Sequence, residues 1–157
     1  MTEVVQYAGG WMFDRMMAGW DVTVHVADVG ETRPVQILGA TVLPLECSLA
    51  AAEHGPVPRA LAVAGRLVEC DDRVRRGVLH TIDEGIAEVR VWGDGLPAEV
   101  ERRCTPLPHR LSVAARAFKA QALAALESSE QPSLTEVFSG AVVATGYRSV
   151  ADLTPAV

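Results

Sequence analysis

Three polar residues stand where the predicted strands end, and their side chains could bind a small ligand. Asp28 closes the run DVTVHVAD, Thr41 follows Gly39 near the end of VQILGATV, and Asp94 lies between glycines at the end of AEVRVWGDG. If these strands run parallel, their carboxyl ends meet at the edge of a sheet where α/β proteins bind ligands. The pattern predicts a polar site, although aspartate and glycine are also the residues that ordinary turns favour.

His25 lies in the same valine-rich run as Asp28 and is added to this ligand-binding set. A histidine acts as a general base only when a partner lies within hydrogen-bond reach. The sequence offers Glu88 or Asp28 as that partner. A structural histidine with a satisfied ring is the favoured interpretation, and no catalytic residue is assigned.

No metal site and no cofactor is predicted. His80, Asp83 and Glu84 stand at helical spacing, which is more typical of ion pairs on a helix surface than of a metal site. The chain contains no Walker-type phosphate loop, no GxGxxG fingerprint and no glycine-flanked serine typical of a nucleophile elbow.

Tryptophan and arginine residues indicate the surfaces best suited to a partner. Trp11 and Trp20 each follow a glycine and are expected to anchor core or interface packing, since large aromatic side chains dominate both. Arg102, Arg103 and Arg110 stand at or before the start of the longest predicted helix, where positive charge opposes the helix dipole. We expect these five residues to contribute to an interface.

A second arginine cluster consists of Arg73, Arg75 and Arg76 and could bind phosphate groups. Acidic residues on both sides favour a self-compensating helix surface instead. The net charge of −6 also argues against nucleic acid as a partner, because nucleic-acid binding needs clustered cations.

Composition indicates a globular, cytoplasmic protein. The 157 residues suffice for one domain, and 49% of them are hydrophobic, but only 5% are aromatic, which predicts a core of valine, leucine and alanine. The N-terminal residues lack the basic region of a secretory signal, and no apolar run approaches the roughly 20 residues that span a bilayer. Three widely spaced cysteines, Cys47, Cys70 and Cys104, are expected to be reduced and mostly buried.

The pattern of apolar residues predicts the secondary structure. Helices are expected over 3–18, 45–53, 59–70, 71–85, 97–103 and 109–128, and strands over 21–28, 35–42 and 87–95. The long helix should bury the stripe Leu111, Ala114, Ala115, Phe118, Ala122 and Leu126. A possible added strand lies over 140–147 in a segment rich in serine, threonine, glycine and proline.

These elements predict an α/β fold with a small mixed sheet of three or four strands packed against several helices. Because the strands alternate, two layers are favoured over a three-layer doubly wound fold. Residues 1–128 should form a single domain, followed by a C-terminal segment over 129–157. The second sheet face would then show Thr23, His25, Glu88, Arg90 and Trp92.

No residue pattern identifies a reaction. The leading hypothesis is a cytoplasmic, non-catalytic binding or interaction domain that acts as a homodimer through its long helix and the less apolar sheet face. The alternative is a small ligand-binding domain or enzyme that uses the strand-end residues. A nucleic-acid-associated regulator using the arginine cluster is the weakest hypothesis, and no membrane association is expected.

Overall fold

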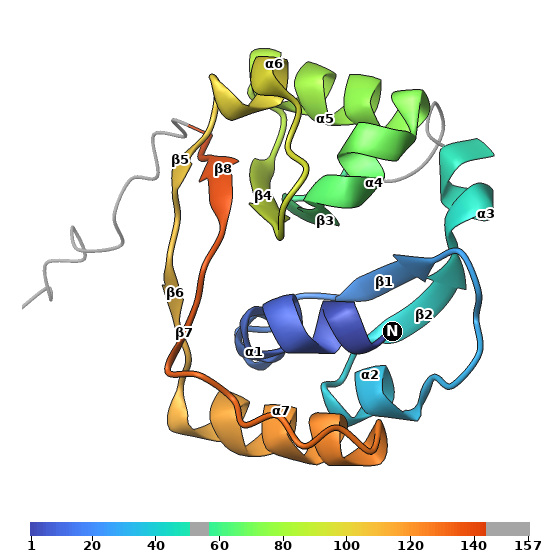
Figure 1. The fold of residues 1–157 in the computed structure, drawn as a ribbon, viewed down its shortest axis with the longest axis vertical. Coiled ribbons are helices and arrows are strands. Elements are labelled where there is room, and N and C mark those ends of the chain that lie inside the picture. The colour runs from blue at the N-terminus through green and yellow to red at the C-terminus, as the bar shows by residue number, and fades with distance from the viewer. Residues whose placement is uncertain (51–56, 144–157) are drawn as a thin grey trace, which may run out of the picture.

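Short helices and strands alternate along the computed structural model, which describes residues 1–50 and 57–143 (Figure 1). In chain order the elements are α1 (Thr2–Met17), β1 (Thr23–Val26), α2 (Arg33–Ile37), β2 (Thr41–Pro44), α3 (Leu45–Ala50), β3 (Ala60–Ala64), α4 (Gly65–Cys70), α5 (Asp72–Asp83), β4 (Glu88–Trp92), α6 (Ala98–Glu101), β5 (Thr105–Pro106), β6 (His109–Arg110), α7 (Val113–Ala125), β7 (Thr135–Glu136) and β8 (Ser139–Ala141).

The strands form one four-stranded sheet and two separate pairs. The larger sheet has the order β3-β4-β8-β5, with β3 parallel to β4 and β8 antiparallel to both of its neighbours. β1 and β2 form a parallel pair, and β6 and β7 form an antiparallel pair. The predicted α/β class with a small mixed sheet is confirmed.

The segment after α7 returns along the chain that precedes α7. β7 and β8 run beside β6 and β5, and together they form a long ribbon along one side of the molecule (Figure 1). This ribbon connects α7 with the sheet that carries α4, α5 and α6. The possible strand over 140–147 begins within β8, and its remainder lies outside the described residues.

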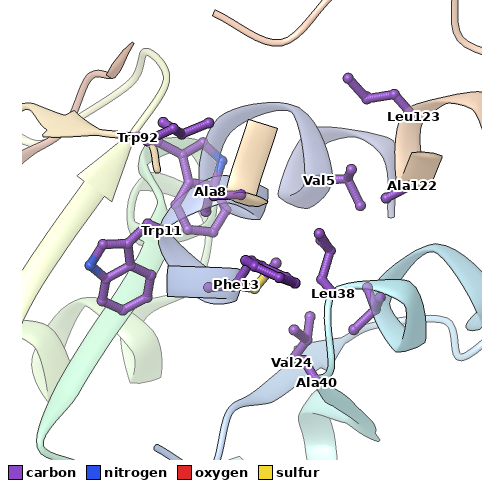
Figure 2. Packing of buried hydrophobic residues seen from close by; sticks show 14 of the residues in the cluster. Val5, Ala8, Trp11, Phe13, Val24, Leu38, Ala40, Trp92, Ala122 and Leu123 are labelled. Carbon is purple, nitrogen blue, oxygen red and sulfur yellow. The ribbon is translucent and has the colours of Figure 1, made fainter. Parts of the chain in front are cut away.

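Helix α1 occupies the centre of the larger core. Its buried side chains contact α7, the β1–β2 unit with α2, and Trp92 at the end of β4 (Figure 2). Val5 lies beside Ala122 and Leu123 in this view, while Trp11 lies on the opposite side of the view, toward Trp92. A smaller core joins Val68, Val78 and Val100 from α4, α5 and α6 to the other face of the β3–β4 pair.

The prediction of a helix over 59–70 is wrong for its first half, which forms β3. Ala60, Ala62 and Ala64 pack toward the α1 core, whereas Leu61 and Val63 pack toward the smaller core. Both sets are apolar, so the alternation typical of a strand is hidden in the sequence.

The prediction that Arg90 and Trp92 belong to an open sheet face is also wrong. Arg90 is 8% exposed and Trp92 is 6% exposed, because α1 of the same chain covers this face. The Arg90 guanidinium donates to the Glu88 carboxylate and to the Leu107 carbonyl oxygen, which satisfies its buried charge. On the β1–β2 pair, Thr23 and His25 are exposed as predicted.

The strand predicted over 35–42 is divided between α2 and β2. Pro34 stands at the start of α2, a position that proline favours, and Val35 and Leu38 are fully buried three positions apart. Gly39 has a φ of +76°, which ends this helical segment, and β2 begins only at Thr41.

Helix α7 begins later than predicted. Ser112 caps it by accepting a hydrogen bond from the Ala115 amide at 3.0 Å, and residues 109–110 form β6 instead. The buried face consists of Ala115, Lys119, Ala122 and Leu123. The predicted apolar stripe is therefore wrong at Ala114 and Phe118, which are exposed.

Candidate functional site

A buried ion pair connects α1, α7 and the returning ribbon. Lys119 is 2% exposed and Glu136 is 3% exposed, and the Lys119 ammonium donates to Glu136 Oε1 at 2.6 Å. Both charges lie deep in the larger core region, where an unpaired charge would be very costly.

The same two side chains bond to the backbone in the middle of α1. Lys119 Nζ donates to the carbonyl oxygen of Gln6 at 2.6 Å. Glu136 accepts from the amides of Gly10 at 2.7 Å and Trp11 at 2.8 Å. The Gln6 carbonyl and the Gly10 amide are partners in a regular α-helix, so the ion pair bonds to both backbone groups of one helical turn.

Gly9 and Gly10 of α1 leave the space that these contacts need. A Cβ on Gly10 would lie 2.3 Å from Leu111 Cδ2 and 3.1 Å from Glu136 Oε1. A Cβ on Gly9 would lie 3.2 Å from Leu38 Cδ1. Glycines weaken helices in isolation, and here their missing side chains leave room for Glu136 and Leu111.

The ion pair forms part of the wall of a surface cavity of about 450 Å³. The rest of the described lining comes from α1, the end of β4, α7 and the returning segment: Gln6, Tyr7, Val91, Gly93, Asp94, Leu123, Glu130, Gln131, Ser133, Thr135, Val137, Phe138 and Ser139. A second cavity of about 320 Å³ shares Gly93, Asp94 and Ser139 with the first and extends to Glu101. Volumes in this range suit small-molecule ligands.

The cavity lining is acidic. Asp94, Glu130 and Glu136 line the larger cavity, and Lys119, the only cation that the described residues contribute to its lining, is already paired with Glu136. Among the described residues, Asp94 and Glu101 line the smaller cavity and no cationic side chain does. Tyr7, which is 40% exposed, adds an aromatic side chain to the larger cavity. The combination favours a cation over an anion.

The three predicted strand-end residues do not form one site. β1 and β2 are parallel with Thr23 opposite Thr41, so Thr41 lies at the start of β2 and Asp28 lies beyond the opposite end of this pair. Asp94 follows β4 in the other sheet. Of these three residues only Asp94 lines a described cavity.

His25 has a partner that the sequence analysis did not identify. Its Nδ1 atom lies 2.5 Å from the Ser48 hydroxyl of α3, rather than near Glu88 or Asp28. Burial lowers the pKa of His25, which favours the neutral ring. No acidic partner of its other ring nitrogen is found among the described residues, so the pair lacks the third group that orients a catalytic histidine.

Arginine and aromatic side chains alternate in a stack between α1 and the larger sheet. The Arg15 guanidinium lies 4.8 Å from the centre of the Trp20 ring and 5.5 Å from that of Trp11. The Arg59 guanidinium lies 5.1 Å from the centre of the Trp20 ring, and the Arg90 guanidinium lies 5.7 Å from the centre of the Trp11 ring. Each distance suits a cation–π interaction. Trp11 is only 6% exposed, so its main role is packing within the chain.

Of the three arginines expected at an interface, Arg103 bonds within the chain, whereas Arg102 and Arg110 are exposed on different elements. Arg103 pairs with Asp83 at 2.7 Å and donates to the Glu99 carbonyl oxygen. Arg102 and Arg110 are exposed, at the end of α6 and in β6. The expected conflict with the helix dipole does not apply to Arg110, because α7 begins only at Val113.

The arginine cluster of α5 is compensated by acids, as the sequence analysis favoured. Arg73 donates to both carboxylate oxygens of Glu46 and pairs with Asp71 at 2.8 Å. The Arg73 hydrogen bonds lower the pKa of Asp71 to about 2. Arg75 pairs with Asp72 and Glu99. These contacts leave little free positive charge for a phosphate group.

The prediction of mostly buried cysteines is wrong. Cys47 and Cys70 are exposed, and only Cys104 is half-buried, in a setting where burial raises the pKa of its thiol. All of them are free thiols. Within residues 1–50 and 57–143, no group of three or more histidine, cysteine or acidic side chains is arranged to hold a metal ion.

Comparisons of the chain with protein-family models, curated proteins and solved structures find no match. Within the described part of the chain, no helix is both long enough and apolar enough to cross a membrane.

Sequence reasoning missed Lys119 and Glu136. Lys119 is the only lysine beside thirteen arginines, and it stands four positions after Ala115 and four before Leu123. A helical stripe drawn through those apolar neighbours would have included it, but lysine is normally assigned to solvent. Glu136 had no comparable signal in its polar segment.

Proposed function

We propose that this protein is a non-catalytic binding domain that takes a small molecule with a positively charged amine group. The binding site is the acidic cavity at the carboxyl end of β4, beside the Lys119–Glu136 pair. The observation that carries this proposal is the convergence of Asp94, Glu130 and the Tyr7 ring on one cavity, where the one cation among the described lining residues is already paired.

Ligand binding at this place agrees with the topology of the larger sheet. β3 and β4 are parallel, and Gly93, Asp94 and Gly95 follow the carboxyl end of β4, where α/β folds bind ligands. Gly93 and Gly95 have φ values of +74° and +83°, which define the turn that presents Asp94.

The hydrogen bonds of the buried Lys119–Glu136 pair support a binding function rather than a catalytic one. Lys119 and Glu136 each bond to the backbone of α1 as well as to each other. Groups committed in this way stabilise the wall of a site, whereas a general acid or base must be able to exchange a proton with a substrate.

Titration calorimetry with spermidine tests the proposal. We expect wild-type protein to bind this polyamine and Asp94→Asn to bind it about two- to fivefold more weakly, the usual range for one exposed charge pair. Asp28→Asn is the matched control, since Asp28 is also an exposed aspartate after a strand and lines neither cavity. Absence of binding to the wild-type protein, or an equal loss in both variants, would overturn the proposal.

A further inference from the structure

The outward side of α7 is unusually apolar for a helix surface in contact with water. We define the outer face of α7 as its exposed residues, which are Val113, Ala114, Arg116, Ala117, Phe118, Gln121, Ala124 and Ala125. Arg116 is the only charged residue among them. Val113 is 84% exposed and Phe118 is 45% exposed. Surface helices normally turn charged and polar residues outward, so this face has the composition of a contact surface.

Phe118 is held in place although it is half-exposed. Its ring stacks on the buried ring of Phe13 in α1, with centroids 4.6 Å apart. A partner that packs against Phe118 would therefore meet a side chain whose position is already ordered, which lowers the entropic cost of binding.

Two unpaired charges flank the apolar centre of this face. Arg116 lies in the first turns of α7, and Glu127 follows the end of the helix. Both are exposed, and neither forms an ion pair within the part of the chain that the structure describes. Their opposite signs make the face complementary to a reversed copy of itself.

The spacing along the helix has a two-fold character. Counted along the sequence, Arg116 precedes the point between Gln121 and Ala122 by as many positions as Glu127 follows it, with Glu127 two residues beyond the last residue of α7. The same holds within the helix for Phe118 and Ala125. A two-fold axis at that point brings Arg116 opposite the partner's Glu127 and Phe118 opposite the partner's Ala125. Each contact then occurs twice, as isologous interfaces require. Ala117 and Ala124 lie one on each side of this axis along the middle of the exposed arc, where small side chains allow helices to approach closely.

We propose that the outer face of α7 binds a second copy of this chain, with the two helices antiparallel. A second copy fits better than an unrelated protein because large residues meet small ones and opposite charges meet under one symmetry operation. This dimer goes beyond the proposed ligand binding and does not depend on it, since none of the outer-face residues lines either cavity.

A charge exchange across the interface tests this dimer in the full chain. Analytical ultracentrifugation of the wild-type protein should give twice the 16.7 kDa chain mass. Arg116→Glu and Glu127→Arg should each raise the dimer dissociation constant about tenfold, because each change places like charges opposite one another at two symmetric positions. The double variant should restore most of the wild-type affinity.

One further variant is a matched control for charge reversal, and a second disrupts the outer face of α7 directly. Arg76→Glu makes the same charge reversal at an exposed position of α5 and should leave the dissociation constant unchanged. Ala117→Glu places a charge at the centre of the outer face, keeps a good helix former, and should give a folded monomer by circular dichroism. A monomeric wild type at about 100 μM, a dimer indifferent to Arg116→Glu and Ala117→Glu, or no recovery in the double variant would overturn the proposal.

Discussion

Lys119 and Glu136 are charged residues in a place where charge is costly. Desolvation of two ions is compensated only when their geometry is good and further hydrogen bonds satisfy the remaining donors and acceptors. Both conditions are met, since the pair is joined at 2.6 Å and each member also bonds to the α1 backbone. The pair therefore positions α1, α7 and the ribbon relative to one another.

Removal of one member of this pair should be strongly destabilising. Lys119→Met keeps the length of the side chain but leaves the Glu136 carboxylate buried without its counter-ion. We expect the free energy of unfolding in urea to fall by about 3–5 kcal/mol. Arg76→Met, an exposed change on α5 away from the proposed dimer face, should alter it by less than about 0.5 kcal/mol.

The double variant Lys119→Met/Glu136→Gln separates pairing from packing. Neutralising the carboxylate removes the uncompensated charge, so the two changes together should cost clearly less than the sum of the single changes. Purely additive losses would show that the two charges act independently, contrary to this account.

At the residue scale, the sequence identified part of the candidate site. Asp94 could be predicted because an aspartate between glycines after a strand is a recognisable strand-end pattern. Glu136 could not, since its partners are residues 10, 11 and 119, far away along the chain. Hydrophobic periodicity reports local spacing and contains no information on such distant contacts.

Helix α1 illustrates how a local weakness can be required by a distant contact. Its Gly9–Gly10 pair lowers helix propensity, yet Lys119, Glu136 and Leu111 occupy the space that side chains would need. These glycines lie where α7 and the returning ribbon contact α1 most closely.

Glycine-to-alanine substitutions in α1 and in α5 should change the free energy of unfolding in opposite directions. Gly10→Ala should lower the free energy of unfolding by about 1–3 kcal/mol, because its Cβ would meet Leu111 and Glu136. Gly77→Ala in α5 meets no atom within 4 Å and should raise stability by up to about 1 kcal/mol through better helix propensity. Thermal and urea unfolding of both variants check this, and a neutral or stabilising Gly10→Ala would contradict the packing described for α1.

An element whose apolar residues recur with a single helical period, such as α5, was predicted well. An element with apolar residues on both faces, such as β3, was not. The DDRVRRGVLHTIDEG helix corresponds to α5, and Asp71 accepts from the Arg73 and Val74 amides at its N-terminus. β3 was mistaken for a helix because apolar residues fill both of its faces. The tertiary environment, with α1 on one side and α4–α6 on the other, determines that structure and is invisible to local pattern.

On the scale of the whole molecule, the ribbon β5–β6/β7–β8 brings together parts that the chain order separates. It spans from α7 to the β3–β4 pair (Figure 1), and residues of its returning segment line the cavity beside α1 and Asp94. Strand order could not be derived from the sequence. This is why Asp28, Thr41 and Asp94 looked equivalent in the sequence, although of these three only Asp94 lines either of the two cavities described above.

Chemical-shift mapping shows whether a cationic small molecule binds at the carboxyl end of β4. Spermidine is titrated into uniformly ¹⁵N-labelled protein, and the backbone amide signals are followed. We expect the perturbed amides to belong to Tyr7, Gly93, Asp94, Gly95 and Ser139, while the signals of Asp28 and Thr41 do not shift. An unchanged spectrum, or perturbations confined to the β1–β2 pair, would contradict this expectation.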